Sequence, residues 1–249
     1  MKISIIIPCY NEEKTIEKII DKVRDSMSSP YEIIVIDDGS TDKTGLILEN
    51  NLKNKINKIL INEKNYGKGY SVKKGIEVTN GDIIIIQDAD LEYDPKDIEK
   101  FLAKINKNQA DCIMGSRFTG NERSVLNFWH MIGNKFITLL FNFMNNTAFT
   151  DIYCCYCLFH RTLVKPEQLK SKGWGQQAEI LTYVVKNSKK IYEIAVNYNG
   201  RTYDDGKKIT WRDGFAAIYH ILRYNLSPRS FFLIFVSFFM CCYFFFKFL

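Results

Sequence analysis

Short runs of β-branched residues alternate with amphipathic stretches through the first half of the chain. Five of these runs are almost continuously apolar and have the length of strands: residues 3–7, 32–36, 58–61, 83–86 and 111–114. Strands that are buried on both faces have this pattern, and they are typical of parallel sheets. We therefore expect the five runs to form the core of one sheet.

Helical periodicity fills the intervals between the runs. One helical face is marked by apolar residues at the spacing i, i+3, i+4, i+7 and i+11: Ile16, Ile19, Ile20, Val23 and Met27. Asp42 is a candidate N-cap for a helix that reaches about residue 53, and Asp94 with Pro95 has the composition of an N-cap and a first helical position. The alternation of strand and helix predicts a doubly wound α/β sheet.

The second half of the chain contains a longer amphipathic segment at residues 125–146. Its large apolar side chains are interrupted by polar residues: His130, Asn134, Lys135 and Asn142. We predict an amphipathic helix here, which lies either in a membrane interface or against the edge of the sheet. A further strand is expected over residues 191–198, and a second amphipathic helix over residues 210–224.

The C-terminal segment has a different composition from the rest. Residues 231–249 hold nine of the 18 phenylalanines and a single charged residue, Lys247. About 20 apolar residues cross a bilayer as a helix, so residues 226–249 are predicted to be a single-pass membrane anchor after a domain formed by residues 1–225. A buried core helix is the alternative, but residues 242–246 are apolar on every side. Arg223 and Arg229 precede the anchor, and the positive-inside rule then places the domain in the cytoplasm.

Composition and charge exclude several classes of protein. With 46% hydrophobic and 25% charged residues among 249, the chain is suited to an ordinary globular domain and not to a disordered chain. Seven cysteines among 249 residues are too sparse, and odd in number, for a disulfide scaffold. The net charge of +6 is too small to indicate binding to a nucleic acid, and no nucleic-acid motif accompanies it.

Acidic residues gather where three of the predicted strands end. Ligands of open α/β sheets bind at the carboxyl ends of the strands, and these ends are followed by Glu12, by Asp37 with Asp38, and by Asp88 with Asp90. The glycine fingerprints of dinucleotide-binding and phosphate-binding loops are missing. Asp88 and Asp90 are two residues apart and project to the same side of an extended backbone. This geometry suits Mg²⁺ or Mn²⁺ shared with substrate phosphates, and Glu92 adds a third ligand if the chain turns back.

Four ordered motifs carry a resemblance to a known family. They are S-I-I-I-P-C-Y-N-E at 4–12, D-D-G-S-T-D at 37–42, N-Y-G-K-G at 65–69 and D-A-D-L-E at 88–92. Together they resemble a family 2 glycosyltransferase of the Rossmann-like GT-A fold, and within that family the polyprenyl (dolichyl or undecaprenyl) phosphate sugar transferases. Further matches lie at 115–117, 150–156 and 201–208, so that the resemblance covers residues 1–225 as the catalytic domain.

The resemblance implies a role for each matching residue. Donor binding is assigned to Pro8, Tyr10, Glu12, Asp37, Asp38, Lys68, Asp88 and Ala89. The metal that bridges the donor pyrophosphate is assigned to Asp88, Asp90 and Glu92, although relatives carry Gln at the last position. The acceptor phosphate is assigned to Ser116, Arg117, Arg201 and Lys208. The residues implied in catalysis are Asp90, Arg117, Arg201 and Asp151.

Two of these residues also have a purely structural interpretation. Arg117 follows a predicted strand, where a surface salt bridge is common. Asp151 either orients the sugar or the acceptor, or serves as a helix N-cap.

The expected reaction is a metal-dependent, inverting transfer of a hexose from a UDP- or GDP-linked sugar to a polyprenyl phosphate at the cytoplasmic face of a membrane. A lipid phosphate is already an anionic nucleophile near neutral pH, so it needs arginines to place it and no general base. One alternative is a related transferase that acts on a glycan or glycolipid hydroxyl and needs a carboxylate base. Another is a non-catalytic, membrane-tethered scaffold that binds nucleotide sugars.

Overall fold

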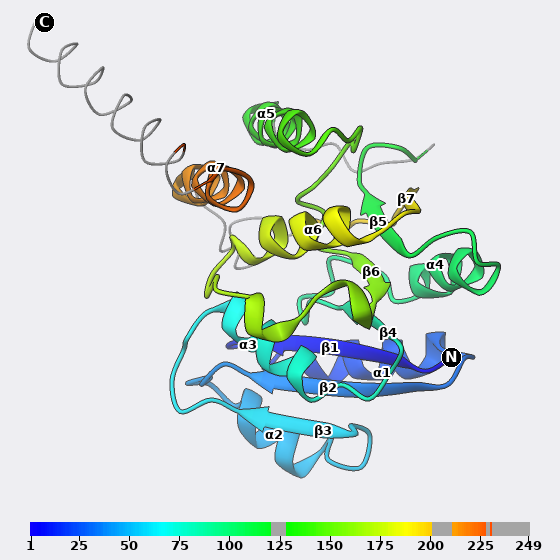
Figure 1. The fold of residues 1–249 in the computed structure, drawn as a ribbon. Helices are drawn as coiled ribbons and strands as arrows, with labels where there is room; N and C mark the ends of the chain where they lie inside the picture. Colours follow the sequence, from blue (N-terminus) through cyan, green and yellow to red (C-terminus); the bar gives the residue numbers. More distant parts are fainter. Residues whose placement is uncertain (121–127, 201–210, 228–229, 231–249) are drawn as a thin grey trace, which may run out of the picture.

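The computed structural model describes residues 1–120, 128–200, 211–227 and 230. A seven-stranded sheet in the order β3-β2-β1-β4-β6-β5-β7 lies at its centre (Figure 1). The strands are β1 (Ile3–Cys9), β2 (Tyr31–Asp37), β3 (Lys58–Ile61), β4 (Ile83–Ile86), β5 (Cys112–Ser116), β6 (Cys157–His160) and β7 (Ile191–Ala195). The sheet is mostly parallel, since only β6 runs antiparallel to its neighbours β4 and β5. This confirms the predicted α/β class.

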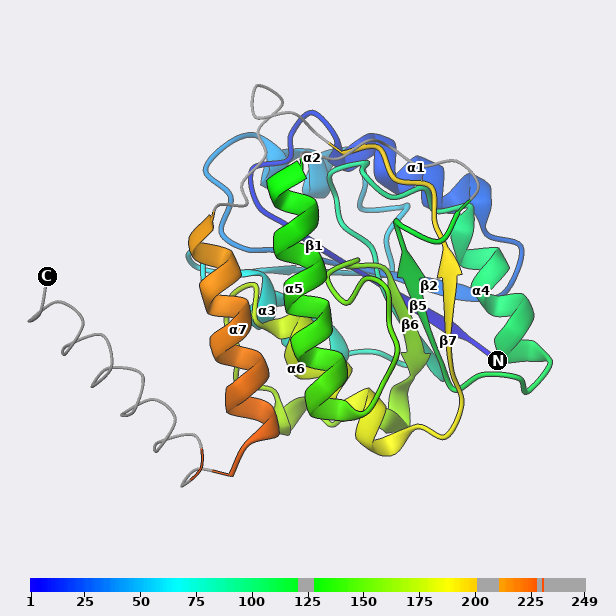
Figure 2. The same ribbon diagram turned by 90° about the horizontal axis from the view of Figure 1, so that it is seen from above.

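Helices cover both faces of the sheet. They are α1 (Ile16–Ser26), α2 (Thr44–Asn50), α3 (Lys68–Glu77), α4 (Asp97–Asn106), α5 (Phe128–Asn145), α6 (Gln176–Asn187) and α7 (Trp211–Asn225), with short 3₁₀ turns at Arg161–Leu163 and Pro166–Gln168. In Figures 1 and 2, α1, α2 and α4 lie on one face and α3 and α6 on the other, while α5 and α7 lie side by side over α6. The order of the elements thus brings the carboxyl ends of the parallel strands to one edge.

The core is built by the apolar runs that the sequence pattern singled out. All seven residues of β1 and all four isoleucines of β4 are buried. The apolar face of α1 is buried at Ile16, Ile19, Ile20 and Val23, as its spacing predicts. Burial of apolar surface on this scale is the main stabilising term of an α/β domain, and it holds the strand ends in fixed positions.

Several predicted boundaries were wrong by a few residues. The helix expected to start at Asp94 and Pro95 begins at Asp97, because Asp94 forms a turn in which its carboxylate accepts a hydrogen bond from the Lys96 amide at 3.1 Å. The Asp42 carboxylate does accept the Thr44 amide, but α2 ends at Asn50 and not near residue 53. The strand expected over 191–198 ends at Ala195. Helices α5 and α7 confirm the two long amphipathic helices, and their predicted first residues, 125–127 and 210, lie outside the described residues.

Three elements were not predicted from the hydrophobic pattern. Helix α3 contains two glycines and few large apolar side chains, and Gly75 is needed because a Cβ there would lie 2.5 Å from Ile6. Strand β6 has the sequence C-L-F-H, which lacks the β-branched residues that mark the other short strands. In α6 the buried face includes polar residues such as Gln176 and Glu179, which obscure the periodicity.

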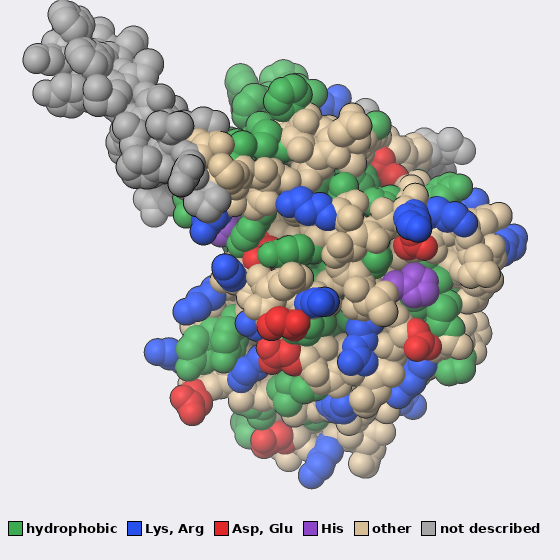
Figure 3. All heavy atoms as spheres, in the orientation of Figure 1, with side chains coloured by type: hydrophobic (Ala, Val, Ile, Leu, Met, Phe, Trp, Pro, Cys, Tyr) green, Lys and Arg blue, Asp and Glu red, His purple; other side chains and the backbone are tan. Residues whose placement is uncertain are grey.

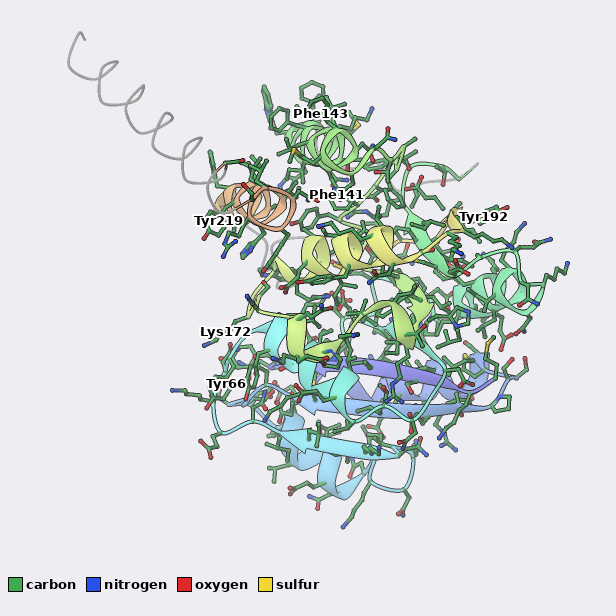
Figure 4. The ribbon with its side chains drawn as sticks, viewed as in Figure 1. Tyr66, Phe141, Phe143, Lys172, Tyr192 and Tyr219 are labelled. Carbon is green, nitrogen blue, oxygen red and sulfur yellow. The ribbon has the colours of Figure 1, made fainter. Side chains whose placement is uncertain are left out.

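Helix α5 presents a row of large apolar side chains to solvent. It packs against α7 and α6. The predicted position against the edge of the sheet is therefore not the one observed. Figure 4 shows Phe141 between α5 and α6 and Phe143 on the outer side of α5, where it is 82% exposed. The exposed apolar side chains of the two helices are Phe128, Trp129, Ile132, Phe136, Leu139 and Phe143 on α5, with Phe215 and Tyr219 on α7. We call this set the α5/α7 apolar face; its α5 part gathers at the top of Figure 3.

The predicted membrane anchor lies outside the described residues from 231 onward. In the ranges that the structure does describe, no helix has both the length and the hydropathy needed to span a bilayer.

Candidate active site

A cleft of about 260 Å³ opens at the carboxyl ends of β1, β4 and β5. Ten residues assigned from the sequence line it: Pro8, Tyr10, Glu12, Asp38, Lys68, Asp88, Ala89, Asp90, Glu92 and Arg117. Asp37, Ser116 and Asp151 lie beside the cleft and not in its lining. Arg201 and Lys208 fall outside the described residues. The structure therefore brings together most of the residues that the motifs suggested.

The segment after β1 is held by hydrogen bonds from the turn after β2. Asn11 adopts a left-handed conformation (φ 54°), and its side-chain oxygen accepts a hydrogen bond from the Thr41 amide at 2.8 Å. The Glu12 amide donates to the Thr44 hydroxyl at 2.9 Å, and the Glu12 carboxylate accepts from the Thr15 hydroxyl at 2.7 Å. These contacts fix the wall of the cleft formed by Tyr10 and Glu12.

Asp37 and Asp38 differ in what their carboxylates contact. Asp37 accepts hydrogen bonds from the amide and the hydroxyl of Ser40, at 3.0 and 2.5 Å. Asp38 accepts from the Asn62 side chain at 2.7 Å, from the Tyr66 amide at 3.1 Å and from the Gly67 amide at 2.7 Å. Asp38 therefore shapes the loop that leads into α3. The assignment of both residues to the donor stays a prediction.

A loop from the second half of the chain closes over the start of α3. Gly67 has a φ of 98°, and a Cβ at this position would lie 2.5 Å from the Lys172 carbonyl oxygen. The Tyr70 amide donates to the same oxygen at 3.1 Å. This packing, near the Tyr66 and Lys172 labels of Figure 4, brings Trp174 into the lining of the cleft.

Lys68 and Asp88 form an ion pair inside the cleft. The Lys68 ammonium lies 2.5 Å from Asp88 Oδ1, and the two side chains are only 14% and 15% exposed. Burial alone would lower the pKa of Lys68, but the charge of Asp88 outweighs it and holds that pKa above its ordinary value. The ammonium also lies 5.2 Å from the centre of the Trp174 ring. Lys68 is therefore a fixed positive charge beside the predicted metal ligands.

The acidic motif turns sharply after Asp88. Leu91 is left-handed (φ 65°), and Asp90 Oδ1 accepts the Glu92 amide at 3.1 Å. The Glu92 carboxylate accepts a hydrogen bond from the Tyr198 hydroxyl at 3.0 Å. Burial raises the pKa of Tyr198, and the charge of Glu92 raises it further, so the hydroxyl keeps its proton and remains a donor.

The residues present fit a divalent cation through Asp88 and Asp90. Mg²⁺ and Mn²⁺ are often bound by one or two carboxylates together with substrate phosphates, and the cleft already holds a buried cation, Lys68, against Asp88. Within the described ranges, no three His, Cys, Asp or Glu side chains converge tightly enough to hold a metal ion by themselves. Glu92 lines the same cleft, where its carboxylate accepts the Tyr198 hydroxyl, and its assignment as a third metal ligand stays a prediction.

Arg117 is held by a fully buried carboxylate. Its Nε donates to Asp151 Oδ2 at 2.7 Å and its Nη2 donates to Asp151 Oδ1 at 2.8 Å, while its amide donates to Oδ2 at 3.2 Å. Asp151 has no exposed surface, and the Arg117 side chain is 15% exposed. The surface salt bridge considered for Arg117 is therefore wrong, and Asp151 does not begin a helix. Ser116 is buried beside the pair and shares a hydrogen bond with the Thr150 hydroxyl at 2.6 Å.

Charges from both sides of the cleft act on one thiol. Burial raises the pKa of Cys155 to about 11; the cations of Lys68 and Arg117 oppose this rise, and the anions of Asp88 and Asp90 add to it. Cys155 also lines the cleft. The acidic pair and Arg117 thus lie around a common space.

Sequence reasoning missed several residues of the lining. Tyr153 and Cys155 lie within the motif at 150–156 but were given no role. Tyr198 follows β7, and inspection of that strand end would have found it. Trp174 lies in a loop whose sequence has no distinguishing pattern, so only the packing on α3 reveals it.

Comparison with known proteins identifies relatives along most of the chain. An uncharacterised protein of Methanocaldococcus jannaschii is 32% identical over 221 residues, which cover 82% of this chain and 93% of the relative. The dodecaprenyl-phosphate galacturonate synthase of Rhizobium johnstonii is 25% identical, over 93% of this chain and 70% of its own length. The undecaprenyl-phosphate 4-deoxy-4-formamido-L-arabinose transferase of Photorhabdus laumondii is 29% identical, over 83% and 62%.

The fold is shared with solved glycosyltransferase structures. The glucosyl-3-phosphoglycerate synthase of Mycobacterium tuberculosis, crystallised with Mn²⁺, uridine diphosphate and phosphoglyceric acid, superimposes with a TM-score of 0.68 at 18% identity, over 91% of this chain and 79% of the other. Residues 4–166, which contain the acidic motif and Arg117, match the family described as Glycosyl transferase family 2. A GT-A-like sheet that carries this cleft at its strand ends, and a family match over more than half of its length, show that the chain belongs to glycosyltransferase family 2.

Proposed function

We propose that this enzyme transfers a hexose from a nucleotide-diphosphate sugar to a polyprenyl phosphate, with inversion at the anomeric carbon. The observation that carries the proposal is the pairing, in one cleft, of an acidic motif with an arginine that a buried carboxylate holds by two parallel hydrogen bonds. Two relatives that match most of this chain have names that combine a polyprenyl phosphate with a sugar. One is a dodecaprenyl-phosphate galacturonate synthase, and the other is an undecaprenyl-phosphate 4-deoxy-4-formamido-L-arabinose transferase.

The donor half of the reaction concerns the acidic end of the cleft. Departure of a nucleoside diphosphate leaves negative charge that must be stabilised. Asp88 and Asp90 would hold Mg²⁺ or Mn²⁺ here, and this ion would neutralise the developing charge as a Lewis acid. Lys68, a permanent cation held against Asp88, would contact the same phosphates. The donor is a UDP- or GDP-linked sugar, whose base and ribose would lie against Tyr10 and Glu12.

The acceptor half concerns Arg117. A phosphate monoester on a lipid is negatively charged near pH 7, so the cleft has to orient it and does not have to remove a proton. The guanidinium fork suits this task, because it binds phosphate oxygens in pairs. Attack from the face opposite the departing diphosphate inverts the anomeric carbon. Arg201 and Lys208, which the family resemblance also assigns to phosphate, would add to this binding.

The membrane would supply the acceptor at the α5/α7 apolar face. Aromatic side chains are typical of surfaces that lie at the level of lipid headgroups, and Trp129 of this face is 79% exposed. We propose that residues 231–249 anchor the chain and that Arg223 and Arg229 keep the catalytic domain on the cytoplasmic side. The soluble donor and the lipid acceptor would then meet in one cleft.

A transfer assay tests the reaction. The full chain is incubated with Mn²⁺, a panel of radiolabelled UDP- and GDP-hexoses, and undecaprenyl or dolichyl phosphate, and the lipids are then extracted. We expect acid-labile label in the lipid fraction for one donor, and none when the free polyprenol replaces its phosphate. Label in an acid-resistant product, or transfer to the polyprenol, would instead indicate a hydroxyl acceptor. Binding of the donor without turnover would indicate a scaffold.

Membrane association gives a second prediction. A chain that ends at Ser230 is expected to float with anionic vesicles to a smaller extent than the full chain, because it lacks the predicted anchor. Replacing Trp129, Phe136 and Phe143 by Ser in the shortened chain should remove the remaining binding, since these three exposed aromatic residues are spaced along the whole row on α5. Vesicle flotation followed by immunoblotting measures both effects. Equal flotation of all three proteins would contradict the membrane proposal.

A further inference from the structure

Among the polar side chains that helix α5 directs to the interior of the domain, opposite its exposed apolar row, Asn134 contacts the carboxylate that holds Arg117. The Asn134 side-chain amide donates a hydrogen bond to Asp151 Oδ1 at 2.8 Å. The side-chain oxygen of Asn134, Oδ1, is buried, and among the residues that the structure describes it has no hydrogen-bond partner. Asparagine is a poor helix former, and an unpaired buried oxygen is unfavourable. The stability of the helix itself therefore does not explain why an asparagine occupies position 134 within α5.

The bond made by Asn134 completes the environment of a single carboxylate. Asp151 Oδ1 accepts from both Asn134 and Arg117 Nη2, and Oδ2 accepts from the Arg117 Nε and amide. Arg117 thus supplies three of these four hydrogen bonds, and Asn134 supplies the fourth from a different element. This fourth bond helps to fix the plane of the carboxylate. Because the two parallel bonds to Arg117 lie in the same plane, a rotation of the carboxylate would move the guanidinium.

The backbone of Asp151 is fixed from the opposite side. Glu193 on β7 accepts hydrogen bonds from the Thr150 amide at 2.9 and 3.0 Å and from the Asp151 amide at 3.1 Å. Strand β7 thus positions the main chain of Asp151, whereas α5 positions its side chain. The orientation of Arg117 in the cleft depends on both elements.

We propose that Asn134 is a positioning residue that acts through Asp151 to orient Arg117 toward the acceptor phosphate. The inference rests on the proposed function, in which Arg117 binds that phosphate. It assigns a specific task to α5, the helix whose other side carries the α5/α7 apolar face. The helix proposed to contact the lipid surface is thereby bonded, through one carboxylate, to the arginine that receives the lipid headgroup.

The first test separates binding of the acceptor from binding of the donor. In the full chain, Asn134→Ala should raise the KM for the polyprenyl phosphate about 10-fold, as expected for a lost hydrogen bond to a charged group. The KM for the nucleotide sugar should change less than about 2-fold. Asn134→Asp keeps the size of the side chain and places a second carboxylate against Asp151, so its effect on the acceptor KM should be at least as large. Asn145→Ala is the control, because within the described part of the chain the Asn145 side chain bonds to the Phe141 carbonyl of the same helix and not to Asp151.

A double-mutant cycle separates positioning from a general structural effect. Arg117→Lys keeps the charge but loses the planar fork. If Asn134 acts through Arg117, then Asn134→Ala should change the acceptor KM by less than about 2-fold in the Arg117→Lys background. Equal losses in both backgrounds would show a structural role and overturn the inference. So would an unchanged acceptor KM in both Asn134 variants.

One further outcome concerns the proposed function itself. If Arg117→Lys leaves transfer to the lipid phosphate unchanged, the assignment of Arg117 to the acceptor fails, and the inference about Asn134 fails with it. If Arg117→Lys impairs transfer and the Asn134 variants do not, only the inference about Asn134 is overturned. Thermal unfolding of each variant shows whether it folds. If Asn134→Ala does not fold, the same KM values are compared for Asn134→Asp, which keeps the size of the side chain.

Discussion

Asp90→Asn is expected to reduce sugar transfer to the lipid phosphate by at least about 100-fold while the protein stays folded. Asp90 lines the cleft, and its Oδ1 accepts the Glu92 amide. Asparagine can make the same bond through its side-chain oxygen, so the turn after β4 should be preserved. The negative charge is lost, however, and with it most of the affinity for a divalent cation beside the donor phosphates.

The matched control for Asp90→Asn is Asp94→Asn. Asp94 Oδ1 accepts the Lys96 amide in a turn of the same kind, and Asp94 does not line the cleft. This variant should transfer sugar at close to the wild-type rate. Initial rates over a range of Mn²⁺ concentrations, together with the thermal unfolding temperature, distinguish loss of metal affinity from loss of structure. Undiminished transfer by Asp90→Asn would remove the metal from the mechanism.

Arg117→Ala is expected to cause a large loss of stability. It leaves the fully buried Asp151 carboxylate without its cation, and breaking a buried ion pair in this way costs about 3–5 kcal/mol. Transfer should fall as well, because the acceptor phosphate loses its guanidinium. Denaturant unfolding measures the first effect, and the lipid-extraction assay measures the second.

The double substitution Arg117→Ala with Asp151→Asn separates the two effects. A neutral side chain at position 151 leaves no unpaired charge in the interior, so much of the lost stability should return. Activity should not return, since no guanidinium is present in the cleft. A single Arg117→Ala variant as stable as the wild type would contradict the importance of the buried pair. A double variant with normal transfer would contradict the role of Arg117.

The sequence predicted the strands and the acidic motif because both depend on short stretches of chain. Four consecutive isoleucines in β4, followed closely by Asp88 and Asp90, are enough by themselves to indicate a buried strand with carboxylates at its end. The family motifs added Arg117 and Lys68, and the structure places both in the cleft. The identity of the family followed from the order of these motifs.

The remaining features depend on contacts between distant residues, which a local pattern does not contain. Trp174 reaches the cleft because Gly67 lets a loop from the second half approach the start of α3. The Glu92 carboxylate accepts a hydrogen bond from Tyr198, which lies more than 100 residues later, and the motif at 88–92 gives no sign of this contact. Asn134 was noticed only as an interruption in an apolar helix, and its role emerged once Asp151 was found beside it.

The order of the strands has a consequence for how the chain reaches its native state during synthesis. Strands β1 to β4 are adjacent in the sheet and are complete once residue 86 has left the ribosome, but β6, which covers the other side of β4, ends at His160. Until then the isoleucines of β4 form an open edge, and such an edge favours pairing with other chains. The nascent protein is therefore most vulnerable to aggregation during the interval in which residues 87–160 are made.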